Sequence, residues 1–150
     1  MVVNNPIPTE RVSGYVERIL VIDNYSINNQ FTLPLFANGT PTLLFLTTKA
    51  SINGNATNYL TLFGQTVFPE TLNIREDFTL IAYFFKPFAL FSLFGVSAKE
   101  LTDFPVDLDL LQQSQANELK ERLLNAGTTA GMMELLDDYI FNLIERSKAE

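Results

Sequence analysis

The stretch FTLIAYFFKPFALFSLFG, Phe78–Gly95, contains the clearest change of structure in the chain. Its first part, Phe78–Phe85, has the aromatic and aliphatic composition of a β-strand. Pro87 fits the first turn of a helix and Gly95 fits the position just after its end, so a short apolar helix is predicted between them. The stretch therefore joins a strand-rich part of the chain to a helical part.

Strand signals run through the segment before this junction. The predicted strands are Val16–Asn24, Phe31–Leu35, Thr42–Thr47, Tyr59–Phe63, Gln65–Phe68 and Phe78–Phe85. Asn53 and Gly54 lie between two strand-like segments and indicate a hairpin turn. Pro34 indicates an edge strand or a bend, because proline cannot donate to a sheet ladder. No connection is long enough for a helical crossover, so antiparallel pairing is expected.

Helix signals dominate the segment after the junction. The predicted helices are Pro87–Gly95, a short helix opened by Ser97, Gln115–Ala126, and a last helix from Thr128 or Thr129 to Lys148. Ser97 and Glu100 have the spacing of a capping box. Asp107 or Asp109 is interpreted as the cap of a brief turn through Leu110. The last helix has apolar residues at the spacing of one amphipathic face.

The order of these elements predicts a single α+β domain over residues 1–150, mainly β over 1–86 and helical over 87–150. A chain of 150 residues with an apolar fraction of 47% can bury one hydrophobic core. The regular spacing of the strands favours an antiparallel β-barrel or sandwich, followed by a carboxy-terminal helical segment.

The composition excludes several kinds of site. The chain has no His and no Cys, which removes the usual general base at neutral pH, thiol nucleophiles, disulfides and Cys/His zinc sites. It has no Walker pattern, no GxGxxG pattern and no EF-hand-like spacing of Asp. A binding protein without cofactor or metal is therefore expected, not an enzyme. The net charge of −7 disfavours direct binding of nucleic acid.

Targeting signals are not visible in the sequence. The first ten residues have neither the basic nor the apolar region of a secretory signal. The longest apolar run, Leu80–Val96, is interrupted by Lys86 and is shorter than the ~20 residues of a membrane helix. A cytoplasmic protein without contact with a membrane is expected.

Because the chain has no His, paired carboxylates are the main candidates for acid–base chemistry. Asp137 and Asp138 are neighbours on the last predicted helix, where successive side chains point about 100° apart. They do not converge on one substrate and are interpreted as part of a solvated helix face. Asp107 and Asp109 are interpreted as capping residues.

Aromatic residues are the strongest compositional signal, with 13 Phe and five Tyr. The cluster within Phe78–Phe94 has two interpretations. It packs the core between the last strand and the following helix, or part of it lines an apolar cavity that holds a small ligand inside a barrel. On the second interpretation, the candidate ligand-binding residues are Asn38, Phe45, Gln65, Tyr83 and Phe85.

The last helix has a second apolar feature. Its apolar stripe is centred near Leu143, and Phe141 projects about 160° away from that centre. Met133 lies at the margin of the stripe. This pattern indicates a contact with a second subunit or an adjacent domain, and Met133 and Phe141 are the candidate interface residues.

Two further stretches carry a family resemblance. The first is LPLFANGTPTLLF, Leu33–Phe45. It is similar to a Pro-x-Gly-x-x-x-Leu-Ile-Phe stretch in the amino-terminal domains of a group of AraC-type transcription regulators. FFKPFALFSLFGVSAKELTDFPVDLDLL, Phe84–Leu111, resembles a second segment of the group. The second match rests on Lys86-Pro87, Phe94-Gly95 and Glu100-Leu101-x-Asp103, and NELKERLLNAG looks like the helix that follows.

The resemblance covers most of Thr9–Glu145. It implies a sensor or dimerisation domain with a cupin-like β-barrel followed by helices. In AraC-type proteins such a domain precedes two helix-turn-helix units, and this chain ends at Glu150, where those units would begin. The resemblance leaves open whether the chain is an excised domain or a stand-alone relative. It implies contact with DNA only through a carboxy-terminal helix-turn-helix domain, and it supplies no ligand-binding residues.

The predicted function is a regulatory domain of an AraC-like transcription regulator that senses a small, apolar or partly polar effector. The alternative is a dimerisation module with a solid barrel and no ligand. A homodimer is the expected assembly.

Overall fold

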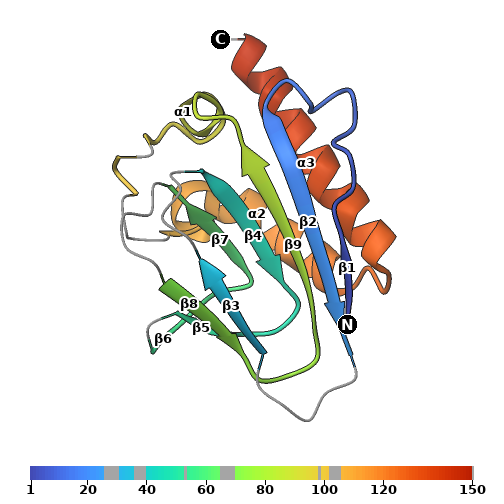
Figure 1. Cartoon of the computed structure of the whole chain (residues 1–150). Coiled ribbons are helices and arrows are strands. Elements are labelled where there is room, and N and C mark those ends of the chain that lie inside the picture. The colour runs from blue at the N-terminus through green and yellow to red at the C-terminus, as the bar shows by residue number, and fades with distance from the viewer. Residues whose placement is uncertain are drawn as a thin grey trace.

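The computed structural model describes residues 1–25, 31–35, 40–52, 54–64, 70–97, 99–101 and 106–149. The strands are β1 (Val2–Asn4), β2 (Val16–Asn24), β3 (Phe31–Leu35), β4 (Thr42–Leu46), β5 (Ser51–Ile52), β6 (Asn55–Ala56), β7 (Leu60–Phe63), β8 (Glu70–Ile74), β9 (Phe78–Phe85) and β10 (Val106–Asp107). The helices are α1 (Ala89–Phe94), α2 (Asp109–Leu124) and α3 (Thr129–Ala149), as Figure 1 shows.

The described strands form two antiparallel sheets. The large sheet has the order β1-β2-β9-β4-β7-β10, and the small sheet has the order β3-β8-β5-β6. Each order ends in two edge strands, so the described strands form open sheets and no closed barrel. The structure confirms an α+β fold with antiparallel sheets and carboxy-terminal helices.

The large sheet has a hydrophobic core on each of its faces. Successive side chains of a strand point to opposite faces, and in β9 Ile81, Tyr83 and Phe85 join the core on the helix side. Leu80 and Ala82, which alternate with them, join the core between the two sheets. β9 therefore contributes side chains to both cores, so a shift of this strand would change the packing on both faces of the sheet.

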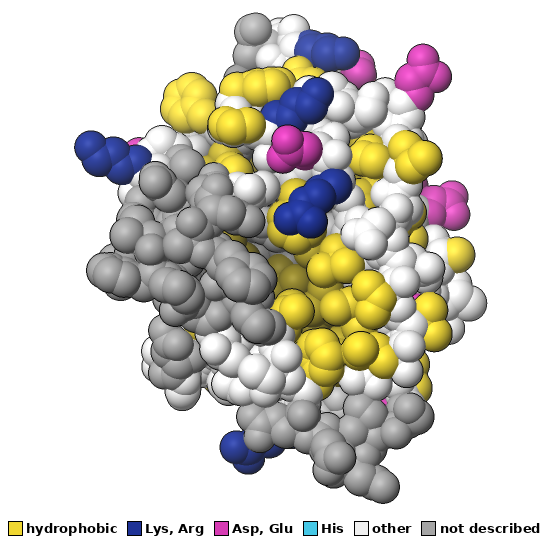
Figure 2. Space-filling view, viewed as in Figure 1, with side chains coloured by type: hydrophobic (Ala, Val, Ile, Leu, Met, Phe, Trp, Pro, Cys, Tyr) yellow, Lys and Arg dark blue, Asp and Glu magenta, His cyan; other side chains and the backbone are white. Residues whose placement is uncertain are grey.

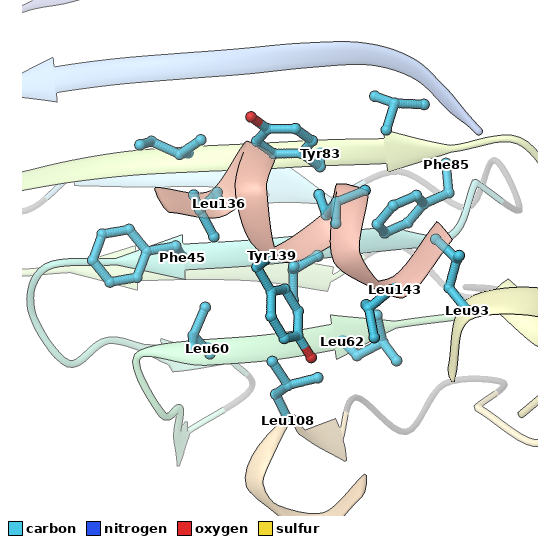
Figure 3. Packing of buried hydrophobic residues seen from close by; sticks show 14 of the residues in the cluster. Phe45, Leu60, Leu62, Tyr83, Phe85, Leu93, Leu108, Leu136, Tyr139 and Leu143 are labelled. Carbon is cyan, nitrogen blue, oxygen red and sulfur yellow. The ribbon is translucent and has the colours of Figure 1, made fainter. Parts of the chain in front are cut away.

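The core on the helix side is the larger of the two. Figure 3 shows Phe45, Tyr83 and Phe85 of the large sheet beside α3, with Leu93 of α1 nearby. The buried residues of α3 are Met132, Leu136, Asp137, Tyr139, Ile140, Leu143 and Ile144. Their spacing of three and four residues puts them on one helix face, which confirms the predicted last helix.

The core between the sheets is partly open. Figure 1 shows the small sheet in front of the lower left part of the large sheet, whereas the upper parts of β2 and β9 have no strand in front of them. Leu46 and Leu80 are fully buried, but Leu20 and Phe84 are only partly buried. The described strands of the small sheet do not cover the whole face.

Two of the predicted helix signals form as expected. α1 ends at Gly95, which has a φ of 72° and donates its N–H to the carbonyl oxygen of Phe91. This left-handed backbone favours glycine. The backbone N–H of Glu100 donates to Ser97 Oγ at 3.1 Å, and the N–H of Ser97 donates to Glu100 Oε2 at 3.3 Å. The hydrogen bonds of the capping box are confirmed. The short helix predicted to begin at Ser97 is not found, because the described residues 99–101 form a turn.

The prediction for the segment between Asp107 and Ala126 was wrong in two respects. The brief turn and the separate helix are one continuous helix, α2. The N-cap residue is Leu108, and no side chain caps the helix there. Leu108, Ala116 and Leu123 are fully buried against the rest of the core, and this packing holds the helix without an aspartate cap.

Among the described helices, none combines the length and the hydropathy that crossing a bilayer requires.

Candidate ligand-binding site

A corner of the large sheet that none of the described strands covers is the best candidate for a binding site. The strand register sets Arg18 of β2 beside Phe84 of β9, and Phe84 beside Thr42 of β4. One row further along, Leu20 lies beside Ala82. We call Arg18, Leu20, Thr42, Ala82 and Phe84 the open corner.

The open corner is an apolar hollow with a polar rim. Figure 2 shows a hollow lined by hydrophobic side chains on this face of the molecule, with a Lys or Arg side chain at its upper edge. Leu20 and Phe84 line the core between the sheets, and the half-buried Phe31 and Leu33 of β3 pack against the same core. An apolar hollow with a few polar groups at its edge is the usual form of a small-molecule site.

Ala82 has the smallest side chain of the open corner. The register places Ala82 between Leu20 on β2 and Leu44 on β4. Leu80 and Phe84 precede and follow it on the same face of β9. Ala82 therefore has a smaller side chain than any of these four neighbours, and it is buried, with 3% of its surface exposed.

Arg18 is the charged residue of the open corner. Its Cζ lies 4.0 Å from the centroid of the Phe84 ring, which is a cation–π contact. Both ion pairs recorded between described residues involve Arg11. Within the described residues, Arg18 therefore forms no ion pair, and its guanidinium keeps donors that a ligand can use.

Three of the predicted ligand-binding residues lie on the opposite face of the large sheet. Phe45, Tyr83 and Phe85 are 0%, 1% and 0% exposed, and they pack together against the helices. The Tyr83 hydroxyl donates to the carbonyl oxygen of Met133 at 3.4 Å. Burial, with a smaller contribution from the negative charge of Asp137, raises the pKa of Tyr83 above its usual range.

Asn38 and Gln65, the other two predicted ligand-binding residues, lie outside the described residues. The structure thus brings together Phe45, Tyr83 and Phe85, but as core residues beside α3. Contact of any of the five with a ligand stays a prediction.

Phe141 has a partner within its own chain. It is partly buried at the margin of the helix-side core, and Arg11 Cζ lies 4.9 Å from the centroid of its ring. The second apolar feature of α3 therefore contacts the segment that follows β1. A role of Phe141 in an interface between subunits stays a prediction.

Met133 is also partly buried. It lines a shallow hollow of about 400 Å³ together with residues of the amino-terminal segment, of β2 and of the first turn of α3: Asn4, Asn5, Pro6, Val21, Thr129 and Ala130. Its role as an interface residue likewise stays a prediction.

The interpretation of Asp137 as a solvated residue was wrong. Asp137 is 6% exposed and accepts hydrogen bonds from Thr9 Oγ1 at 3.0 Å and from Arg11 Nε at 2.9 Å. Asp138 is exposed, as expected, and also pairs with Arg11. The segment after β1 crosses α3 at this point and covers Asp137, which the pattern of the helix alone does not reveal.

The described residues offer no evident metal site. In the part of the chain that the structure describes, no three His, Cys, Asp or Glu side chains are grouped so that they could hold a metal ion.

Sequence reasoning did not single out Arg18, Leu20 and Ala82 as candidate site residues, and it included Phe84 only as a member of the aromatic cluster. The alternation within β2 carried a usable signal, because Arg18 is a charged residue on the same face as the apolar Leu20. The sequence did not show which face of the sheet the helices would cover.

Comparisons with known proteins place the chain in a family. No curated protein and no solved structure matches it. A family model described as a domain of unknown function, DUF6597, matches residues 5–107. The matched segment contains β2 to β10 and α1, and it ends before α2. Because the match covers more than half of its length, the chain belongs to the DUF6597 family.

Proposed function

We propose that this chain is the ligand-sensing domain of an AraC-like transcription regulator and that a small, partly apolar effector binds in the open corner. The observation that carries the proposal is the apolar hollow on a face of the large sheet that the described strands cover only in part. On that face Arg18 contacts the ring of Phe84, and Ala82 has the smallest side chain. Such a hollow suits a small organic ligand.

The resemblance to AraC-type regulators supports the regulatory part of the proposal. The similar segment Phe84–Leu111 begins in the open corner and continues through α1 to the start of α2. In this proposal the two sheets are an opened form of the cupin-like barrel that the resemblance implies. Binding to DNA would require a carboxy-terminal helix-turn-helix domain, and the regulator would act in the cytoplasm.

β9 supplies a route from the effector to the helices. Ala82 and Phe84 belong to the open corner, and the residue between them, Tyr83, packs in the core beside α3. A ligand that binds one arrangement of β9 and α3 more tightly than another shifts the population toward that arrangement. α3 is the last described helix, so it is the element through which a following domain would respond.

Binding of a neutral apolar dye tests the site. We expect N-phenyl-1-naphthylamine to bind with a saturable rise in fluorescence. In Ala82→Leu the larger side chain occupies the hollow, and the dye should bind at least about tenfold more weakly, which corresponds to 1.4 kcal/mol. Fluorescence titration of both proteins measures the two dissociation constants.

Ala82→Ser is the matched control, because serine leaves the hollow open and should retain dye binding. Overpacking by Ala82→Leu can itself cost about 1–3 kcal/mol of stability, so urea unfolding of each variant must accompany the titrations. Equal dye binding by wild-type protein and a folded Ala82→Leu variant would refute the open corner as the ligand site.

A homodimer without a ligand is the second candidate function. The observation that favours it is strand β1, which ends the large sheet and has no partner on its outer edge among the described strands. Val2 and Val3 on this strand are 56% and 48% exposed. A free apolar edge pairs readily with another strand, and a charge on the edge prevents such pairing.

We expect the wild-type chain to have the mass of two chains in size-exclusion chromatography with light scattering, if this candidate is correct, and Val3→Lys to have the mass of one. Phe91→Lys is the matched control, because Phe91 is 67% exposed on α1 and lies away from β1 (Figure 1). Loss of the dimer in Phe141→Asp, with Val3→Lys unaffected, would assign the interface to α3.

A further inference from the structure

We infer that the open corner selects amphipathic organic anions, which have an apolar body and one carboxylate, sulfonate or phosphate group. The inference rests on the proposed function, because it names the ligand class of the same site. It requires a cation beside the apolar hollow and a path along which the ligand body can lie.

Arg18 supplies the cation. The guanidinium of Arg18 lies over the Phe84 ring, with Cζ 4.0 Å from the ring centroid. This contact holds the guanidinium in the open corner. No carboxylate of the described residues forms an ion pair with it. A planar guanidinium with free donors can bind a carboxylate, sulfonate or phosphate through two parallel hydrogen bonds.

Leu20 and Ala82 supply the path for the ligand body. They lie one side-chain row beyond Arg18 and Phe84 on the same face of the sheet, which is about 7 Å along the strands. A ligand whose anionic head meets Arg18 can therefore place its apolar body over Leu20 and Ala82. The half-buried Phe31 and Leu33 of β3 border the same core.

The net charge of the protein distinguishes a local effect of Arg18 from a general attraction of anions. A net charge of −7 attracts cations and repels anions at long range. A preference for an anion over a neutral or cationic ligand of the same shape must therefore come from a local cation, and Arg18 is the cation of the open corner.

The experiment displaces bound N-phenyl-1-naphthylamine with three eight-carbon ligands, octanoate, 1-octanol and octylammonium. We expect octanoate to displace the dye at about fivefold lower concentration than 1-octanol, the upper range for an exposed ion pair, and octylammonium to be the weakest. The preference should shrink at 0.5 M salt, where charges are strongly screened.

Arg18→Gln should bind octanoate and 1-octanol equally while it retains dye binding. Arg75→Gln is the matched control, because Arg75 is exposed in the turn between β8 and β9, outside the open corner, and its variant should keep the preference. Urea unfolding of both variants establishes that each is folded.

The outcomes separate the two proposals. Equal displacement by octanoate and 1-octanol in the wild-type protein, or an unchanged preference in Arg18→Gln, would overturn the selection of anions and leave the ligand site standing. Failure of the dye to bind the wild-type protein would overturn the proposed function and this inference together.

Discussion

Phe85→Ala is expected to lower the free energy of unfolding by about 3–5 kcal/mol, because it empties a fully buried site. The Phe85 ring meets the Phe94 ring of α1 edge-on, with 5.8 Å between the ring centroids. Figure 3 shows Phe85 in the core where Leu93 of α1 and Leu143 of α3 meet the sheet. Urea unfolding followed by circular dichroism measures the loss.

Phe85→Leu is the matched control and should lose less stability than Phe85→Ala, because leucine leaves a smaller cavity. The folded fraction of Phe85→Ala should still bind N-phenyl-1-naphthylamine with wild-type affinity, because Phe85 lies on the face opposite the open corner. A folded Phe85→Ala protein that no longer binds the dye would contradict this placement and restore Phe85 as a ligand-binding residue.

Asp137→Ala is expected to lower the free energy of unfolding by about 2 kcal/mol. The buried carboxylate accepts hydrogen bonds from Thr9 and Arg11, and bonds to a charged group contribute about 1.5–3 kcal/mol. Arg11 and Thr9 are exposed enough to regain water, which limits the loss. The same urea experiment measures the effect.

Asp138→Ala is the matched control, because Asp138 is the neighbouring residue and pairs with the same Arg11. Its side chain is 51% exposed, and exposed ion pairs contribute only about 0–1 kcal/mol. The difference between the two variants should disappear in an Arg11→Ala, Thr9→Val background. Equal losses for both variants in the wild-type background would show that burial of Asp137 contributes nothing.

The sequence predicted the long elements well. The bounds of β2, β3 and β9 agree with the predicted strands, and α3 extends over nearly the whole predicted last helix. The hairpin at Gly54, between β5 and β6, is also confirmed, with a φ of 81° at that glycine. Each of these elements has a clear β-type composition or helical periodicity and a turn or capping residue at one end. Local sequence signals are therefore sufficient to define them.

Short elements that depend on tertiary contacts were not predicted. β1 consists of three exposed residues and forms because β2 offers an edge. β8 has a mixed composition, and its Leu72 and Ile74 become buried only when the two sheets pack. The predicted strand Gln65–Phe68 lies outside the described residues.

The ligand-binding residues predicted on β4 and β9 and the open corner lie on opposite faces of the large sheet. The aromatic residues of β9 pointed to a cavity, yet Tyr83 and Phe85 fill the core beside the helices, and Phe84 borders the hollow. The alternation along a strand gives two faces and does not say which one a helix covers. That choice depends on α3, which is far away in the sequence, and on the limited extent of the small sheet.

The most direct test of the central claim is a methyl NMR titration with N-phenyl-1-naphthylamine. We expect the largest ring-current shifts at Leu20, Leu33 and Ala82, which belong to the core between the sheets or pack against it. The methyl groups of Leu136 and Leu143 in the helix-side core should move far less. Largest shifts at Leu136 and Leu143, or no shifts at Leu20 and Ala82 when the dye is bound, would contradict a ligand site in the open corner.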